Sequence, residues 1–147
     1  MRRHALLVLA AGCLIAAKPE GSKDLAKFDG TWVTISIEAN GKKIPDEELK
    51  KAPGRLTIKD GKWKLKASDI EQSGTFTVDT SKKPKQIDIK PADGPNAGQT
   101  IKAIYELEGD TMKVCYAAPD QPRPTAFATE EKSGRVLIEY KREKPSK

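Results

Sequence analysis

Apolar and polar residues alternate along most of this chain in short runs, which is the pattern of half-buried β-strands. The first run covers Trp32–Ala39 and the last covers Arg135–Glu143. Pairs of runs flank Asp60-Gly61 and Glu108-Gly109-Asp110, both typical of hairpin turns. The pattern therefore predicts about eight strands, at positions 32–39, 56–58, 63–65, 74–78, 86–90, 100–107, 111–117 and 135–143.

Two short helical segments accompany these strands. Asp24–Phe28 fits one helical turn, which would close one end of a barrel, and Pro45–Lys51 has acids first and lysines last, in agreement with the helix dipole. No segment is long enough for a helix that crosses between parallel strands, so we expect an antiparallel sheet. The economical solution is an all-β, up-and-down barrel, which removes exposed sheet edges; an open or split sandwich is the alternative.

Trp32 conflicts with the residues that follow it. Strict alternation places its side chain on the face opposite Val33, Ile35 and Ile37. Either a β-bulge near Thr34 restores the common face, or the three aliphatic residues pack under a covering segment and the interior is partly polar.

The N-terminus has the pattern of an export signal. Arg2 and Arg3 precede an uncharged run, Ala5–Ala17, that is too short to span a bilayer, which takes about 20 residues. We therefore expect a signal peptide at 1–17, a polar tether at 18–23, a barrel domain at 24–143 and a tail at 144–147. This organisation predicts an exported protein, in the periplasm or outside the cell.

Two processing routes fit the leader. Cleavage near Ala16 or Ala17 would release a soluble protein. Alternatively, Leu9–Cys13 resembles a bacterial lipobox, in which Cys13 carries the lipid and becomes the first residue. Contact with a membrane is expected only through that anchor.

The charge does not indicate a nucleic-acid partner. The chain has 27 basic and 21 acidic residues, and removal of Arg2 and Arg3 with the leader leaves 25 against 21, a net charge of +4. The lysines are interleaved with carboxylates instead of forming a basic stripe with aromatic residues, which is typical of a solvated surface.

Histidine and cysteine usage argues against the common kinds of catalysis. The single histidine, His4, lies in the leader, so the mature domain has neither an imidazole base nor a histidine-based metal site. Cys115 stands between Val114 and Tyr116 in a predicted strand, where a small packed side chain is the expected role. We therefore expect a monomeric protein that is not an enzyme and has no cofactor and no metal.

A series of short motifs carries a family resemblance. In chain order they follow the leader as Gly30-Thr31-Trp32, Asn40-Gly41-Lys42, Pro45–Leu49, Gly74-Thr75-Phe76, Ser81–Lys85, Asp93-Gly94-Pro95, Ile104–Leu107, Gly109-Asp110 and Pro122–Thr125. Together they resemble the uncharacterised, small, secreted, lipocalin-like (calycin-like) domain family of planctomycete-type bacteria, over about Asp24–Glu143. This family has no established activity, ligand or catalytic residues, so the resemblance implies a fold and not a reaction.

The opening Gly30-x-Trp32 and a basic residue in the last strand also resemble the closing device of lipocalin-like barrels. Either Lys141 or Arg142 is positioned to cover the indole. We favour Arg142, because a planar guanidinium stacks better on an aromatic ring. This pair is interpreted as a structural clasp and not as a binding site.

Four aromatic residues fall at inward-compatible positions of different strands. A barrel of about eight strands is either just filled by side chains or holds one small ligand, so these residues are candidates for a cavity lining and equally for core filling. The four are Trp63, Phe76, Tyr105 and Tyr116.

Arg123, between Pro122 and Pro124, is the candidate for a surface contact, with pairing to a nearby carboxylate as the simpler alternative. Two functions follow. The first is a non-catalytic exported protein that holds a small hydrophobic or amphipathic molecule in its barrel. The second is an interaction module with a packed barrel, whose loops around Arg123 contact an envelope protein.

Overall fold

The computed structural model describes residues 22–144. The predicted signal peptide at 1–17, the lipobox ending at Cys13 and most of the tether lie outside the described residues, as do the last three residues of the tail. Within 22–144, no helix has the length and apolar composition needed to cross a bilayer.

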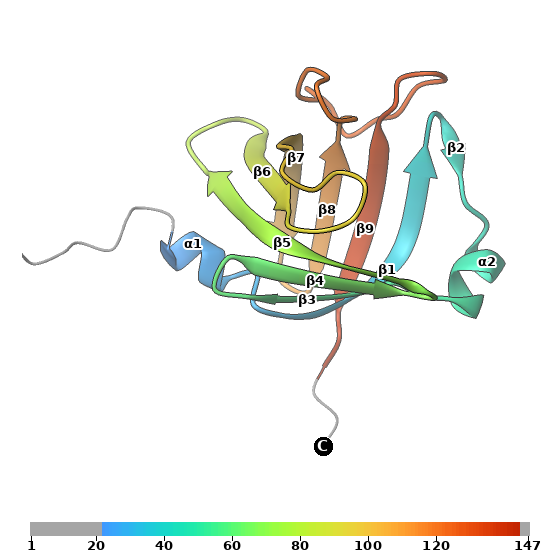
Figure 1. The fold of residues 1–147 in the computed structure, drawn as a ribbon, viewed down its shortest axis with the longest axis horizontal. Helices are drawn as coiled ribbons and strands as arrows, with labels where there is room; N and C mark the ends of the chain where they lie inside the picture. The colour runs from blue at the N-terminus through green and yellow to red at the C-terminus, as the bar shows by residue number, and fades with distance from the viewer. Residues whose placement is uncertain (1–21, 145–147) are drawn as a thin grey trace, which may run out of the picture.

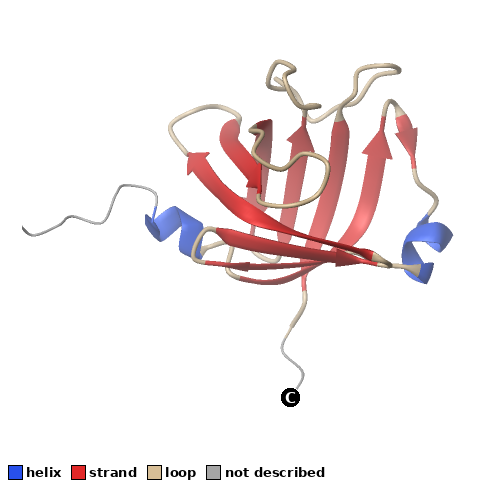
Figure 2. Ribbon diagram, viewed as in Figure 1, coloured by secondary structure: helices blue, strands red, loops and turns tan. Residues whose placement is uncertain are grey.

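The described chain forms a closed antiparallel barrel of eight strands (Figures 1 and 2). Each barrel strand pairs with the next along the chain, and the last, β9, pairs with the first, β1. The predicted up-and-down barrel is therefore confirmed, and the sandwich alternative is wrong. The elements are α1 (Ser22–Ala26), β1 (Gly30–Ala39), β2 (Lys42–Lys43), α2 (Asp46–Lys51), β3 (Arg55–Lys59), β4 (Lys62–Ala67), β5 (Ile70–Asp79), β6 (Lys85–Pro91), β7 (Ile101–Glu108), β8 (Thr111–Tyr116) and β9 (Val136–Arg142).

Two details differ from the sequence prediction. Strand β5 begins at Ile70 and not at Gly74, because Ile70–Ser73 pairs with the far end of β4 although polar residues dominate this stretch. A two-residue strand, β2, also pairs with the end of β1 beside the barrel. Both additions extend the sheet by backbone pairing, which the side-chain pattern does not encode.

A β-bulge in β1 resolves the conflict at Trp32. The register against β9 shifts between Thr34 and Ser36, so Ile35 has no partner and is 44% exposed. Beyond the bulge, Ile37 pairs with the partly buried Ile138 and shares the inner face with Trp32. The bulge alternative is therefore confirmed.

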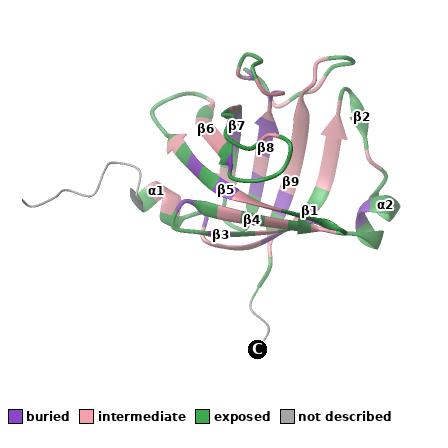
Figure 3. Ribbon diagram, in the orientation of Figure 1, coloured by how far each residue is buried: buried purple, intermediate pink, exposed green. Residues whose placement is uncertain are grey.

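One end of the barrel, here the closed end, is sealed by the segment that precedes β1, called the plug. Phe28 is 1% exposed and packs against Phe76 and Tyr105, with ring centroids 5.1 Å apart in both cases. The Asp29 side chain accepts a hydrogen bond from the backbone nitrogen of Asp60 in the β3–β4 hairpin, 3.0 Å away. Figure 3 shows buried positions along β5, β8 and β9.

The segment 117–135, here called the strap, covers the outside of the barrel. Ile104 and Cys115 are partners on the outer faces of β7 and β8, yet they are only 1% and 0% exposed because the strap lies over them. Pro124 is fully buried there, and the Thr129 hydroxyl donates to Glu38 of β1, 2.9 Å away. Three prolines in the strap predicted irregular structure but not its location.

Candidate functional site

The barrel contains a cavity, partly open to solvent, with a volume of about 190 Å³. It is bounded by inward side chains of seven strands, by Phe28 at the closed end and by Asn96 of the β6–β7 loop, which is yellow in Figure 1. Most of the lining is aliphatic or aromatic. Its full set is Phe28, Leu56, Ile58, Trp63, Leu65, Gln72, Phe76, Ile87, Ile89, Pro91, Asn96, Ile101, Met112, Val114, Tyr116 and Tyr140.

Trp63 owes its position in the wall to Gly74. The two residues are cross-strand partners, and the Trp63 indole nitrogen donates to the carbonyl of Thr75, 3.2 Å away. A Cβ atom on Gly74 would lie 2.8 Å from the Trp63 ring and 2.3 Å from the carbonyl oxygen of Lys90. A side chain at position 74 would therefore push the indole off the wall of the cavity.

Two tyrosines bring hydroxyl groups to the lining. Tyr140 is 8% exposed, and neither it nor Tyr116 hydrogen bonds through its hydroxyl to another residue in the described range. Burial raises the pKa of Tyr116 to about 12. Burial, with a smaller contribution from Tyr116, also raises the pKa of Tyr140. Both phenols are therefore neutral at ordinary pH and able to donate a hydrogen bond.

The polar amides of the lining lie away from the closed end. Gln72 is near the start of β5, and Asn96 is in the loop that follows β6. This loop is attached to β5, since the Asp93 carboxylate accepts hydrogen bonds from the backbone nitrogen and hydroxyl of Ser73, at 2.9 and 3.2 Å. The cavity thus has an apolar floor at Phe28 and Phe76 and a more polar opposite end.

The structure separates the four aromatic candidates. Trp63, Phe76 and Tyr116 line the cavity, whereas Tyr105 lies in the packed core beside Phe28 and does not line it. Sequence reasoning missed Tyr140, which period-two alternation with Ile138 places on the inner face. It also missed Gln72 and Asn96, for which the pattern carries no signal.

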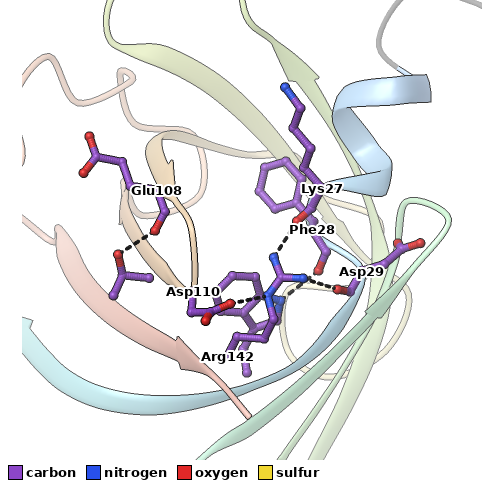
Figure 4. Close-up of polar contacts among 8 residues, drawn as sticks. Lys27, Phe28, Asp29, Glu108, Asp110 and Arg142 are labelled. Atoms are coloured by element: carbon purple, nitrogen blue, oxygen red, sulfur yellow. Dashed lines mark hydrogen bonds and ion pairs between the residues drawn. The ribbon is translucent and has the colours of Figure 1, made fainter. Parts of the chain in front are cut away.

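Trp32 and Arg142 are cross-strand partners at the closed end, where the Arg142 side chain reaches Lys27 and Asp29 (Figure 4). The guanidinium carbon lies 4.5 Å from the centroid of the indole, whose nitrogen donates to the carbonyl of Phe28, 2.8 Å away. Arg142 also donates to the carbonyls of Asp29 and Lys27, at 3.0 and 2.8 Å, and its Nε lies 3.5 Å from the Asp110 carboxylate. The pair fastens the plug to both end strands and lies outside the cavity lining.

The Arg123 side chain points into the molecule. It is 20% exposed, and its guanidinium donates to the carbonyls of Ile87 and Ala103, at 3.1 and 2.7 Å, and to Asp88, at 2.5 Å. Pairing with a carboxylate, the simpler of the two interpretations, therefore describes Arg123. Its role in this structure is to hold the strap against β6 and β7.

Cys115 lies under the strap with its thiol 3.8 Å from the carbonyl oxygen of Ala128. Burial raises the pKa of this thiol, which disfavours the reactive thiolate. Among residues 22–144, no three His, Cys, Asp or Glu side chains are grouped so that they would hold a metal ion.

Comparisons of the chain with protein-family models, with curated protein sequences and with solved structures found no match.

Proposed function

We propose that this chain is a non-catalytic binding protein that holds one small, mainly apolar molecule inside its barrel. The observation that carries the proposal is the cavity of about 190 Å³ with a largely aliphatic and aromatic lining. An apolar cavity of about 150 Å³ in a protein core is large enough to bind benzene. A molecule of one ring, or a short aliphatic chain, fits this volume.

The packing around the cavity supports a preformed site. The floor is held by the aromatic contacts of Phe28, and the wall by the fit between Trp63 and Gly74. A ligand that enters a rigid apolar site loses little affinity to reorganisation of the protein. The alternative, an interaction module that uses Arg123, has less support because this side chain is already bonded within the molecule.

Toluene is a suitable first probe, and its binding can be followed by ligand-observed NMR and calorimetry. Leu65→Trp places a larger side chain in the cavity, and we expect it to weaken toluene binding at least about tenfold by occupying the space. Lys66→Trp is the matched control, since it adds the same side chain to the exposed face of the same strand. Equal toluene affinity in the two variants, or no binding to the wild-type protein, would contradict the proposal.

We further propose that the protein acts after export, on the strength of the leader at 1–17. Mass spectrometry of the mature protein tests this directly. A chain that begins near Lys18 indicates the soluble form, and a lipid mass on Cys13 indicates the anchored form. A mature protein that retains Met1–His4 would show that the leader is not processed.

A further inference from the structure

The lining of the cavity contains no charged side chain among its 16 residues, all in the described part of the chain. On β4, the exposed Lys64 and Lys66 alternate with the cavity residues Trp63 and Leu65, and Lys64 pairs with Glu71, 2.9 Å away. The Asp93 carboxylate accepts two hydrogen bonds from Ser73 and is not part of the lining. A charged group on a ligand would therefore enter the barrel without a partner of opposite charge.

Uncharged hydrogen-bonding groups are present instead. Tyr140 is 8% exposed, and its hydroxyl bonds to no residue in 22–144, but it is not sealed from solvent, because Arg142 Nε is the only fully buried polar side-chain atom of that range without a partner. Tyr116 also lines the cavity, and Gln72 and Asn96 add two amides toward the end opposite the plug. Water can satisfy such a hydroxyl in the absence of a ligand, so a ligand that enters must supply an acceptor of its own to avoid losing that hydrogen bond.

On the basis of the proposed function, we infer that the barrel selects uncharged ligands that carry a hydrogen-bonding group, and discriminates against carboxylates and ammonium ions of the same size. The apolar part of the ligand lies on the floor at Phe28 and Phe76, and its polar group meets the hydroxyls of Tyr116 and Tyr140. Selection against charge follows from the cost of burying an ion without a partner, and selection for the polar group follows from the hydroxyls.

Four one-ring probes that differ in a single substituent test this inference by calorimetry at neutral pH. They are toluene, benzyl alcohol, benzoate and benzylammonium. We expect benzyl alcohol to bind at least about tenfold more tightly than benzoate or benzylammonium, and at least as tightly as toluene. Benzoate or benzylammonium binding within about twofold of benzyl alcohol would overturn the inference and leave the proposed function standing.

A second comparison isolates the hydroxyl groups. In the double variant Tyr116→Phe/Tyr140→Phe, the ratio of benzyl alcohol affinity to toluene affinity should fall about three- to tenfold, the range expected for the loss of a hydrogen bond. Tyr105→Phe is the matched control: it removes a buried tyrosine hydroxyl outside the cavity lining and should leave the ratio unchanged.

Because each ratio is measured within one protein, a general loss of stability does not mimic the result. An unchanged ratio in the double variant would overturn the inference. Failure of all four probes to bind the wild-type protein would contradict the proposed function as well, which distinguishes the two failures.

Discussion

The two halves of this barrel use similar aromatic residues to opposite effect. At the closed end, Phe28, Phe76 and Tyr105 pack ring against ring, and Trp32 is completely buried beneath Arg142. Beyond this packed layer, the side chains of Trp63 and Tyr116 border a cavity of about 190 Å³, and Phe28 and Phe76 form its floor. The difference lies in the segment before β1, which inserts Phe28 at one end only.

This comparison shows that the pairing of strands does not decide whether a barrel is filled. The same eight strands surround both halves, so the volume that remains depends on what enters from the ends. At the closed end the plug is fixed by contacts to the β3–β4 turn, β5 and β9. At the opposite end the β6–β7 loop reaches the cavity through Asn96 and leaves the space beneath it open.

The largest effect should come from exchanging each tryptophan for alanine. Trp32→Ala removes a fully buried indole and should lower the free energy of unfolding by about 3–5 kcal/mol. Trp63→Ala removes a partly exposed ring, so we expect a loss of about 1–2 kcal/mol, together with weaker toluene binding. Urea denaturation and calorimetry measure both quantities. Equal losses of stability would break the distinction between the two halves.

An intermediate effect is expected at the clasp. Arg142→Leu removes the cation–π contact and the hydrogen bonds to the carbonyls of Lys27 and Asp29, and should lower stability by about 2–3 kcal/mol. Lys141→Leu is the control, because the neighbouring Lys141 side chain is exposed. We expect this substitution to change the free energy of unfolding by no more than about 0.5 kcal/mol. Thermal denaturation of the two variants tests which of Lys141 and Arg142 forms the clasp with Trp32. Equal melting temperatures would contradict the assignment to Arg142.

The smallest effect concerns alkaline pH. Burial raises the pKa of Tyr105 and of Tyr116 to about 12, above the value of about 10 in an unfolded chain. Because the folded pKa is the higher one, the stabilisation is complete below about pH 10 and is lost as the pH rises through the folded pKa of about 12. Toluene should raise the pKa of Tyr116 further by excluding water, but not that of Tyr105.

Tyrosinate absorbance in Tyr105→Phe and Tyr116→Phe assigns these two titrations. The Tyr116→Phe variant reports the pKa of Tyr105, and the Tyr105→Phe variant reports the pKa of Tyr116. If toluene shifts both pKa values equally, the ligand does not distinguish the two halves.

Much of the fold could be predicted because short sequence motifs determine the turns, and the strands that pair follow one another directly along the chain. The turns at Asp60-Gly61 and Gly109-Asp110 fix hairpins whose strands follow directly, and both Asp60 and Gly61 adopt the positive φ that such a turn requires, at 51° and 77°. The misplaced face of Trp32 made a bulge near Thr34 one of two alternatives, and the register of β1 against β9 decides for it. The start of β5 could not be predicted, because polar residues pair there through the backbone.

The site was less predictable, since its residues meet only in three dimensions. Alternation placed Trp63, Phe76, Tyr105 and Tyr116 on the inner face, but the insertion of Phe28 decides which of them borders empty space. Arg123 appeared exposed because the sequence does not show that the strap folds back onto β6 and β7. Contacts between distant segments thus determine both which residues line the cavity and whether the Arg123 side chain is exposed.

The most direct test of the central claim is a crystal structure of the protein soaked with toluene. We expect density for one ring inside the barrel, between Trp63, Phe76 and Tyr116, with the packing of Phe28 and Tyr105 unchanged. A barrel whose side chains have closed over this space, or toluene bound only on the outer surface, would contradict it.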